Sequence, residues 1–371
     1  MDVSKHTMRP PRIPLFQVKC TDMYPSTLLV AKLLWLVLFF HGTLPVFEVP
    51  FLPLVRALDV LRPNSGAITF ALQAVFFLGG LALLFNLRPR IACALVGLSL
   101  LVLLLGNRTT YRNHIFICAC VFLLGAMHRR DERPWLLVWQ VAVLYVFSGL
   151  NKLWESDWRS GQFFDAWLGS WVGWYQWGAA RFAPGVFGAI MAWGTIVFEM
   201  TLGIVFLFHR ARAVAIWLAA GFHIGLFVLL EGATFGFFLH NAMILLLAFI
   251  PWDLERAGLS VPGKWAGFLR VVLPWADHDG HISAAESADG VWTLRVPGVG
   301  EMTGLAALCG TLNRLPVVWI GLVGAVLVAP WYFPRVAIDA TLAVILIFGW
   351  IAYFPWSAPA PIRQSSPAGA A

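Results

Sequence analysis

A series of long apolar runs constrains this chain more than any other feature of its sequence. A helix rises about 1.5 Å per residue, so about 20 apolar residues are needed to cross about 30 Å of hydrocarbon. Most of the runs approach or exceed that length, and the fourth is the shortest. They lie at 25–43, 67–86, 91–106, 114–127, 135–151, 184–208, 211–230, 234–251, 315–333 and 336–354.

Composition agrees with a chain that is solvated largely by lipid. Hydrophobic residues make up 60% of the sequence and charged residues only 12%, and the mean hydropathy is +0.77. A soluble domain carries about 25% charged residues, and it could not hide this much apolar surface in one core. The sequence therefore predicts an all-α polytopic integral membrane protein, with about eight core transmembrane helices and about two C-terminal ones.

The basic residues indicate how the helices are oriented. The net charge is +7, but the basic residues lie in short loops beside the apolar runs, which argues against a nucleic-acid partner. With a cytoplasmic N-terminus, the cytoplasmic loops carry twice as many basic residues as the opposite loops, as the positive-inside rule requires. The sequence predicts this orientation, in a bacterial inner (plasma) membrane. Beyond the N-terminal segment, the basic residues of the predicted cytoplasmic loops are Arg88, Arg90, Arg129, Arg130, Arg133, Arg210, Arg212, Arg256, Lys264 and Arg270.

The pattern divides the chain into five parts. We expect a cytoplasmic N-terminal segment at 1–24, a transmembrane core at 25–255 and a polar segment at 256–314. A transmembrane hairpin at 315–354 and a disordered tail at 355–371 follow. The five cysteines have no metal-type spacing and are expected to be packed free thiols.

Two features of the polar segment are open to a structural interpretation. The sequence Asp277-His-Asp-Gly-His281 is compatible with a metal-binding loop, but the same residue types are typical of a turn, and no metal is predicted. The alternation of Val291–Val296 indicates a short strand or hairpin arm.

Ionisable residues inside the apolar runs are the candidates for function, because charge in a bilayer is costly. They are His114, Lys152, Glu199, His223 and His240. The predicted topology places all of these but Glu199 in the non-cytoplasmic half of the bilayer, each on a different helix. Glu199 is expected to lie deeper.

Each of these residues also has a structural interpretation. Lys152 could extend toward the interface, His114 could be a helix-end residue bonded to backbone, and Glu199 could pair with an Arg or His. The functional interpretation is that a desolvated lysine loses its charge readily and acts as a general base. Neighbouring imidazoles would then donate hydrogen bonds or relay protons.

The order of short motifs resembles a known family. Tyr111-Arg-Asn-His-Ile-Phe precedes Leu144-Tyr-Val-Phe-Ser-Gly-Leu-Asn-Lys-Leu and Asp157-Trp-Arg-Ser-Gly, and Glu199, Phe222-His223 and Phe249-Ile-Pro251 follow. Over about residues 25–255, this set resembles the horizontally transferred transmembrane (HTTM) domain, which includes the vitamin K-dependent γ-carboxylases.

The resemblance implies a membrane enzyme. Lys152 would be the base that deprotonates reduced vitamin K or another quinol, which O2 converts to an epoxide; a peptide or protein glutamate would then take up CO2. His114 would assist the carboxylation and His223 would line the pocket. The remaining pocket residues implied by position are Asn113, Tyr145, Glu199 and His240.

The chain departs from the carboxylases in ways that favour the quinol half-reaction. Asn151-Lys152 stands where the animal enzyme has paired lysines. The animal enzyme also carries a large lumenal domain, whereas here only the short polar segment follows the core. That segment, from Asp289-Gly-Val-Trp to Arg314-Leu-Pro, resembles the latter half of the DCC thiol-disulfide oxidoreductase-like proteins without their cysteines. The alternative function is a proton-coupled transporter or a non-enzymatic membrane scaffold, in which Glu199, His223 and His240 form a proton path. The expected partners are the lipid bilayer and a lipid-soluble small molecule.

Overall fold

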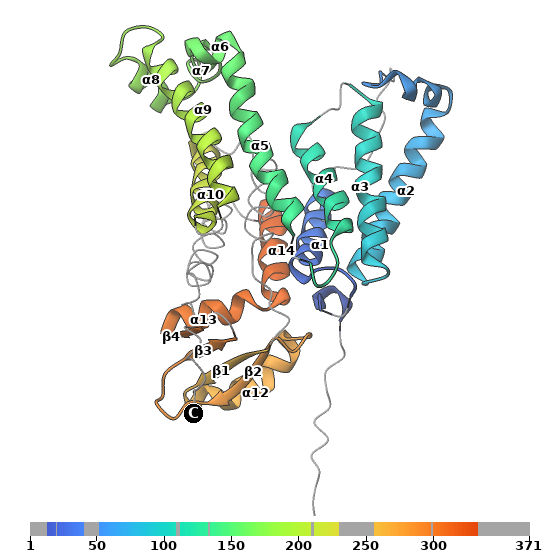
Figure 1. The fold of residues 1–371 in the computed structure, drawn as a ribbon, viewed down its shortest axis with the longest axis vertical. Coiled ribbons are helices and arrows are strands. Elements are labelled where there is room, and N and C mark those ends of the chain that lie inside the picture. Colours follow the sequence, from blue (N-terminus) through green and yellow to red (C-terminus); the bar gives the residue numbers. More distant parts are fainter. Residues whose placement is uncertain are drawn as a thin grey trace, which may run out of the picture.

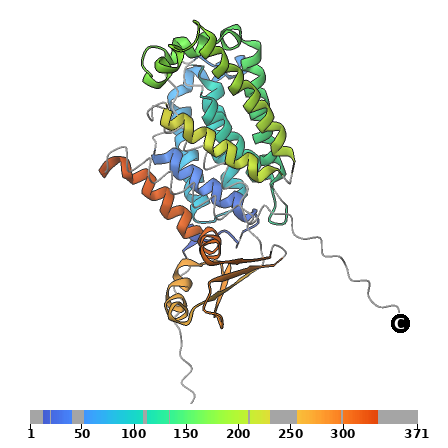
Figure 2. The same cartoon turned by 90° about the vertical axis from the view of Figure 1, so that its left-hand side faces the viewer.

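The computed structural model describes residues 13–19, 21–40, 52–108, 112–132, 134–208, 211–229, 256–297 and 300–332. Long helices stand side by side in a bundle (Figure 1), and a small sheet domain lies beyond one end of it. Three short helices lie at the opposite end, namely α6 (Ser156–Ser160), α7 (Gln162–Leu168) and α8 (Gly173–Ala179). The view turned by 90° shows the same separation of bundle and sheet (Figure 2).

The helices of the bundle follow the predicted apolar runs closely. Among the described residues, four segments are long and apolar enough to cross a membrane, namely Arg56–Leu84, Pro89–Gly106, Trp135–Trp154 and Val186–Leu207. A fifth is added if the bent pair Gly304–Asn313 and Pro316–Ala325 is counted as one span. The protein is therefore an integral membrane protein. The predicted runs at 234–251 and 336–354 lie outside the described residues. The helices are α1 (Pro25–Phe40), α2 (Ser65–Leu84, preceded by the 3-10 helix η2, Arg56–Asn64), α3 (Pro89–Gly106), α4 (Asn113–Met127), α5 (Trp135–Trp154), α9 (Val186–Leu207) and α10 (Arg212–Leu229).

Local sequence explains where several helices begin. Pro89 opens α3, where its missing N–H leaves no bond unmade and its fixed φ suits a helix. The turn before it needs left-handed backbone at Asn86 (φ 59°) and Arg88 (φ 45°). Gly185, with φ of 80°, turns the chain into α9, and a glycine adopts that conformation without a Cβ clash.

Helices α5 and α9 pack closely because glycines let their backbones approach. A Cβ on Gly149 would lie 2.4 Å from Met200 Cγ, and one on Gly203 would lie 2.7 Å from the Ala142 carbonyl oxygen. Small residues are the usual means of close packing between membrane helices, where no hydrophobic effect drives association. This pair of helices forms the frame of the candidate site.

Contacts between loops show which ends of the helices lie together. The Asn86 side chain donates to the carbonyl oxygens of Pro14 and Gln17, and Arg90 Nε donates to the Ala126 carbonyl oxygen, 2.9 Å away. The N-terminal segment and the two loops that follow α2 and α4 therefore share one end of the bundle. The sequence places the N-terminal segment and these two loops on the same side of the membrane. That this side is the cytoplasmic one stays a prediction.

The polar segment folds as a four-stranded mixed sheet, which the all-α expectation did not include. The strand order is β2-β1-β3-β4, with β1 parallel to β2 and antiparallel to β3, and β3 antiparallel to β4. Its core includes Leu259, Val261, Leu294 and Met302. The predicted strand at 291–296 is β3. The elements are β1 (Ala257–Val261), α12 (Gly263–Ala276), β2 (Ile282–Glu286), β3 (Thr293–Val296), β4 (Gly300–Thr303) and α13 (Gly304–Asn313).

The sheet domain returns to the bundle through a sharp bend. Helix α13 and the start of α14 (Pro316–Tyr332) meet at 82°. Trp319 Nε1 donates to the Asn313 carbonyl oxygen at 3.0 Å across this bend, which satisfies a carbonyl at the C-terminal end of α13. The predicted run at 315–333 is thus a helix, and it packs against α1.

Candidate functional site

A polar stripe runs along the face of α5 that meets α9 and α10. Tyr145, Ser148 and Lys152 are spaced by three and four residues, which places them above one another on one side of a helix. The glycine contacts described above turn this side of α5 toward α9. The stripe therefore lies between helices, where a polar group needs a partner.

Lys152 and Glu199 form a direct ion pair across the α5–α9 contact. The Lys152 Nζ lies 2.6 Å from Glu199 Oε2, and their side chains are 17% and 9% exposed. Lys152 Nζ also donates to Ser148 Oγ at 2.6 Å and lies 5.1 Å from the Trp158 ring centroid. Because Ser148 is one turn earlier in α5, the lysine side chain bends back along the helix toward Glu199. This differs from the structural alternative of an extended interfacial lysine, and it explains how Glu199 meets a residue predicted to lie nearer the surface.

Tyr145 and His223 form a second pair, at a position nearer the start of α5 than Ser148 and Lys152. The Tyr145 hydroxyl lies 2.7 Å from His223 Nε2, and both residues are buried. Phe206 of α9 stacks on the Tyr145 ring at a centroid distance of 5.7 Å. Tyr145 lies two helical turns from Lys152 on the same side of α5, so the two pairs lie along one stripe. Either atom of the tyrosine–histidine bond is the donor, according to the tautomer of the imidazole.

Two predicted site residues are on another helix, and a third is outside the described residues. Asn113 and His114 are the first two residues of α4, a helix that packs chiefly against α3. His240 lies outside the described residues. The structure thus joins Lys152 to Glu199 and Tyr145 to His223, and the role of His114 stays a prediction.

Two contacting residues were not among the sequence candidates. Ser148 accepts from Lys152, and its position four residues earlier was a readable signal, since side chains at that spacing meet. Trp158 contacts Lys152 Nζ from the short helix α6 (Ser156–Ser160), after the chain has left α5. No periodicity in the sequence connects it with the stripe.

The connection from α5 to α9, residues 155–185, closes this end of the bundle and is called the cap below. It contains α6, α7 (Gln162–Leu168) and α8 (Gly173–Ala179). Gly161 lies against α9, where a Cβ would be 2.1 Å from Ala189 N. The Tyr175 hydroxyl donates to Asp165 Oδ1 at 2.5 Å, which ties α8 to α7. Trp158 therefore contacts Lys152 from a segment that is held in place by its own packing and hydrogen bonds.

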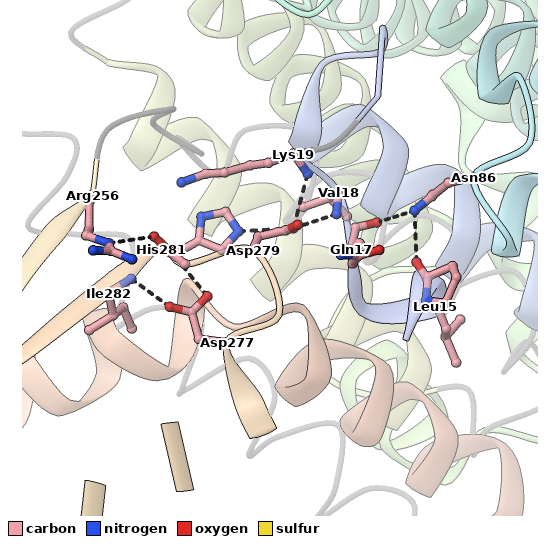
Figure 3. Close-up of polar contacts among 12 residues, drawn as sticks. Leu15, Gln17, Val18, Lys19, Asn86, Arg256, Asp277, Asp279, His281 and Ile282 are labelled. Atoms are coloured by element: carbon pink, nitrogen blue, oxygen red, sulfur yellow. Dashed lines mark hydrogen bonds and ion pairs between the residues drawn. The ribbon is translucent and has the colours of Figure 1, made fainter. Parts of the chain in front are cut away.

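A second polar cluster lies at the other end of the bundle, where the loop 277–281 meets the N-terminal segment 13–19, called the strap (Figure 3). Asp279 Oδ2 accepts from the backbone N–H groups of Val18 and Lys19 at 2.6 and 3.1 Å. Asp277 accepts from the N–H groups of His281 and Ile282. The two carboxylates thus bind backbone, which accounts for the composition that suggested a metal loop.

The strap is also held from the bundle side. Lys32 of α1 is fully buried, and its Nζ donates to the carbonyl oxygens of Pro14, Leu15 and Gln17 at 2.8, 3.2 and 2.9 Å. These bonds use the full donor capacity of an ammonium group. The strap therefore connects the bundle to the sheet domain.

Burial and hydrogen bonds set the charge states in this second cluster. Burial alone raises the pKa of Asp279, but hydrogen bonds from His281 and from the N–H groups of Val18 and Lys19 outweigh it and hold the pKa below its usual range. Burial lowers the pKa of His281, although Asp279 at 3.5 Å opposes the shift. The loop therefore docks with a charged carboxylate and a neutral imidazole.

Comparison with known protein families finds a match for the part of the chain that holds the first cluster. Residues 133–252 match the family model of the HTTM domain, which is the family that the motifs of this region resemble. The match covers Tyr145, Lys152, Glu199 and His223, whereas Asn113 and His114 precede it. No solved structure matches the chain.

Proposed function

We propose that the HTTM domain of this membrane protein is an enzyme in which Lys152, paired with Glu199, removes a proton from a lipid-soluble quinol. The observation that carries the proposal is the 2.6 Å contact between Lys152 Nζ and Glu199 Oε2, with little exposure of either side chain. A carboxylate at that distance is a proton acceptor for the ammonium group.

The pair accounts for a proton without leaving an isolated charge. When the ammonium proton moves to Glu199, the amine has a free electron pair and both groups are neutral. The amine then takes the proton of a substrate hydroxyl. The pair ends as an ammonium and a carboxylic acid, and release of that one proton to water restores the starting state. Ser148 and Trp158 orient the amine during both transfers.

The residues present fit an apolar aromatic alcohol as the substrate. Lys152 Nζ lies beside the Trp158 ring, and the lysine side chain keeps 17% of its surface exposed. Planar rings pack well against aromatic side chains, so a substrate ring that packs on Trp158 would bring its hydroxyl close to the base. The family resemblance supplies the rest of the reaction, in which quinol and O2 give the quinone epoxide and water; coupled uptake of CO2 by a glutamate is part of the same proposal.

The test is epoxide formation by the purified protein in liposomes that contain a reduced naphthoquinone. Mass spectrometry of the lipid extract would follow the epoxide, and an oxygen electrode would follow O2. We expect Lys152→Ala to reduce the rate by about 100-fold or more, because positioned bases contribute about 10² to 10⁴. Lys264→Ala, which removes an exposed lysine of the sheet domain, is the matched control.

Turnover that survives Lys152→Ala would sink this mechanism. The transporter alternative predicts a different result, namely proton flux along a pH gradient that does not depend on reduced quinone. Measuring both in the same vesicles separates the two functions.

A further inference from the structure

The outer surface of the cap, residues 155–185, is unusually rich in exposed aromatic side chains. Trp167, Trp171, Trp177 and Phe182 are 37%, 42%, 66% and 46% exposed. A large exposed apolar patch on a folded protein marks a site of contact with another surface. We therefore expect another molecule to cover these exposed tryptophan and phenylalanine rings.

These rings are displayed by a fixed frame. The Gly161 backbone lies directly against Gly188 and Ala189 of α9, and Tyr175 is bonded to Asp165. Under the cap, Trp158 stacks on Phe163 at 4.2 Å between ring centroids. The cap thus has its own packed interior, and the exposed rings do not take part in that packing.

The ends of α5 give the depth at which the cap lies. Trp135 and Trp154 are the first and last residues of α5, and both rings are exposed, at 45% and 70%. Nineteen residue steps of about 1.5 Å separate them by about 29 Å, the thickness of the hydrocarbon layer. The cap begins at the residue after Trp154, and it lies at that end of the bundle (Figure 1). Its level is that of the headgroups, where tryptophan gathers in membrane proteins.

The apolar surface of the cap continues that of the spans. Phe147 of α5 and Ile190, Trp193 and Val197 of α9 are exposed on the bundle, where lipid covers them. The Arg181 guanidinium lies 3.2 Å from the centre of the Trp177 ring. An indole with an arginine on its face is suited to the boundary between acyl chains and phosphates, because the ring is apolar and the cation can meet a phosphate.

We propose that the cap is a membrane-interface element, in which Trp167, Trp171, Trp177 and Phe182 lie among the phospholipid headgroups at the end of the bundle opposite the sheet domain. The occupant of this surface is phospholipid. The proposal concerns membrane contact alone and holds whether or not Lys152 is a catalytic base.

Hydroxyl-radical footprinting of the unmodified protein in phosphatidylcholine liposomes tests it, with mass spectrometry of the oxidation of each side chain. Val291 and Leu305 of the sheet domain are 45% and 64% exposed, and they serve as controls for Trp171 and Trp177. Each rate is divided by the intrinsic reactivity of its residue type, so that side chains of similar exposure differ by the lipid that covers them. We expect the corrected rates of Trp171 and Trp177 to be at least about fivefold lower than those of Val291 and Leu305.

Equal corrected rates for the two tryptophans and the two controls would overturn the proposal. A second copy of the chain could also shield the cap, so the measurement is repeated at one protein per vesicle. Protection that persists at this dilution supports lipid as the occupant, whereas protection that disappears assigns the surface to self-association and overturns the proposal.

Discussion

The two polar clusters of this protein, one near each end of the bundle, satisfy their buried groups in different ways. Near the cap, ionisable side chains meet one another, as in the Lys152–Glu199 contact at 2.6 Å. At the strap, Asp279 and Lys32 bond to backbone N–H and carbonyl groups. Backbone N–H and carbonyl groups do not titrate at ordinary pH, so the bonds that Asp279 and Lys32 make to backbone hold the chain in place. Paired titratable side chains can pass a proton between them. The comparison therefore separates a cluster suited to chemistry from one suited to structure.

The largest expected effect tests whether the ion pair is needed for stability. Glu199→Leu leaves the Lys152 ammonium without its carboxylate, and removing one partner of a buried pair costs about 3–5 kcal/mol. We expect the double variant Lys152→Met/Glu199→Leu to recover most of this loss, because two apolar side chains pack without desolvating a charge. Equilibrium unfolding of the purified protein measures the double variant and the two single variants, Glu199→Leu and Lys152→Met. A double variant as unstable as the sum of the single ones would show that the two side chains are not coupled, and it would break the comparison.

The next effect concerns the strap. Asp279→Ala removes the acceptor of the Val18 and Lys19 N–H groups, and hydrogen bonds to a charged group contribute about 1.5–3 kcal/mol. Amide hydrogen exchange at these two residues should become roughly thirtyfold faster, which corresponds to about 2 kcal/mol. Asp289→Ala, at an exposed carboxylate of the same domain, should leave both amides unchanged. If Asp279→Ala also abolished quinol turnover, the two clusters would not be functionally separate.

The smallest effect is the response of the strap to pH. The pKa of His281 is lowered on docking from its ordinary 6.5, so below about pH 6.5 the undocked state takes up a proton that the docked state resists, and docking weakens. The lowered pKa of Asp279 adds a further loss only at more acid pH. Per pH unit the loss is at most about 1.4 kcal/mol.

Lys19 and Asp277 also act on His281, so the variant His281→Gln serves as the reference. Exchange at Val18 should rise between pH 7.5 and 5.5 in the unmodified chain, after correction for the intrinsic rate, and this rise should be absent in His281→Gln. An unchanged pH response in the variant would assign it to another group.

Much of the bundle was predictable because helix length and apolar run length are set by the same bilayer. The predicted runs at 91–106 and 184–208 match α3 and α9 within a few residues. The sheet of residues 257–303 was anticipated only in part, at β3, because the pairing of β1 with β2 and with β3 joins residues far apart in the chain. The β1–β2 pairing, for example, depends on how α12 folds back over the sheet.

The candidate site divides in the same way. The sequence by itself determined which side chains are expensive to bury, since a lysine, a glutamate and a histidine in apolar helices cost free energy wherever they point. Tertiary structure alone decided their partners, because the close approach of α5 and α9 at Gly149 and Gly203 sets which faces meet. It also decided that Asp279 bonds to Val18, about 260 residues away, a contact that no local periodicity encodes.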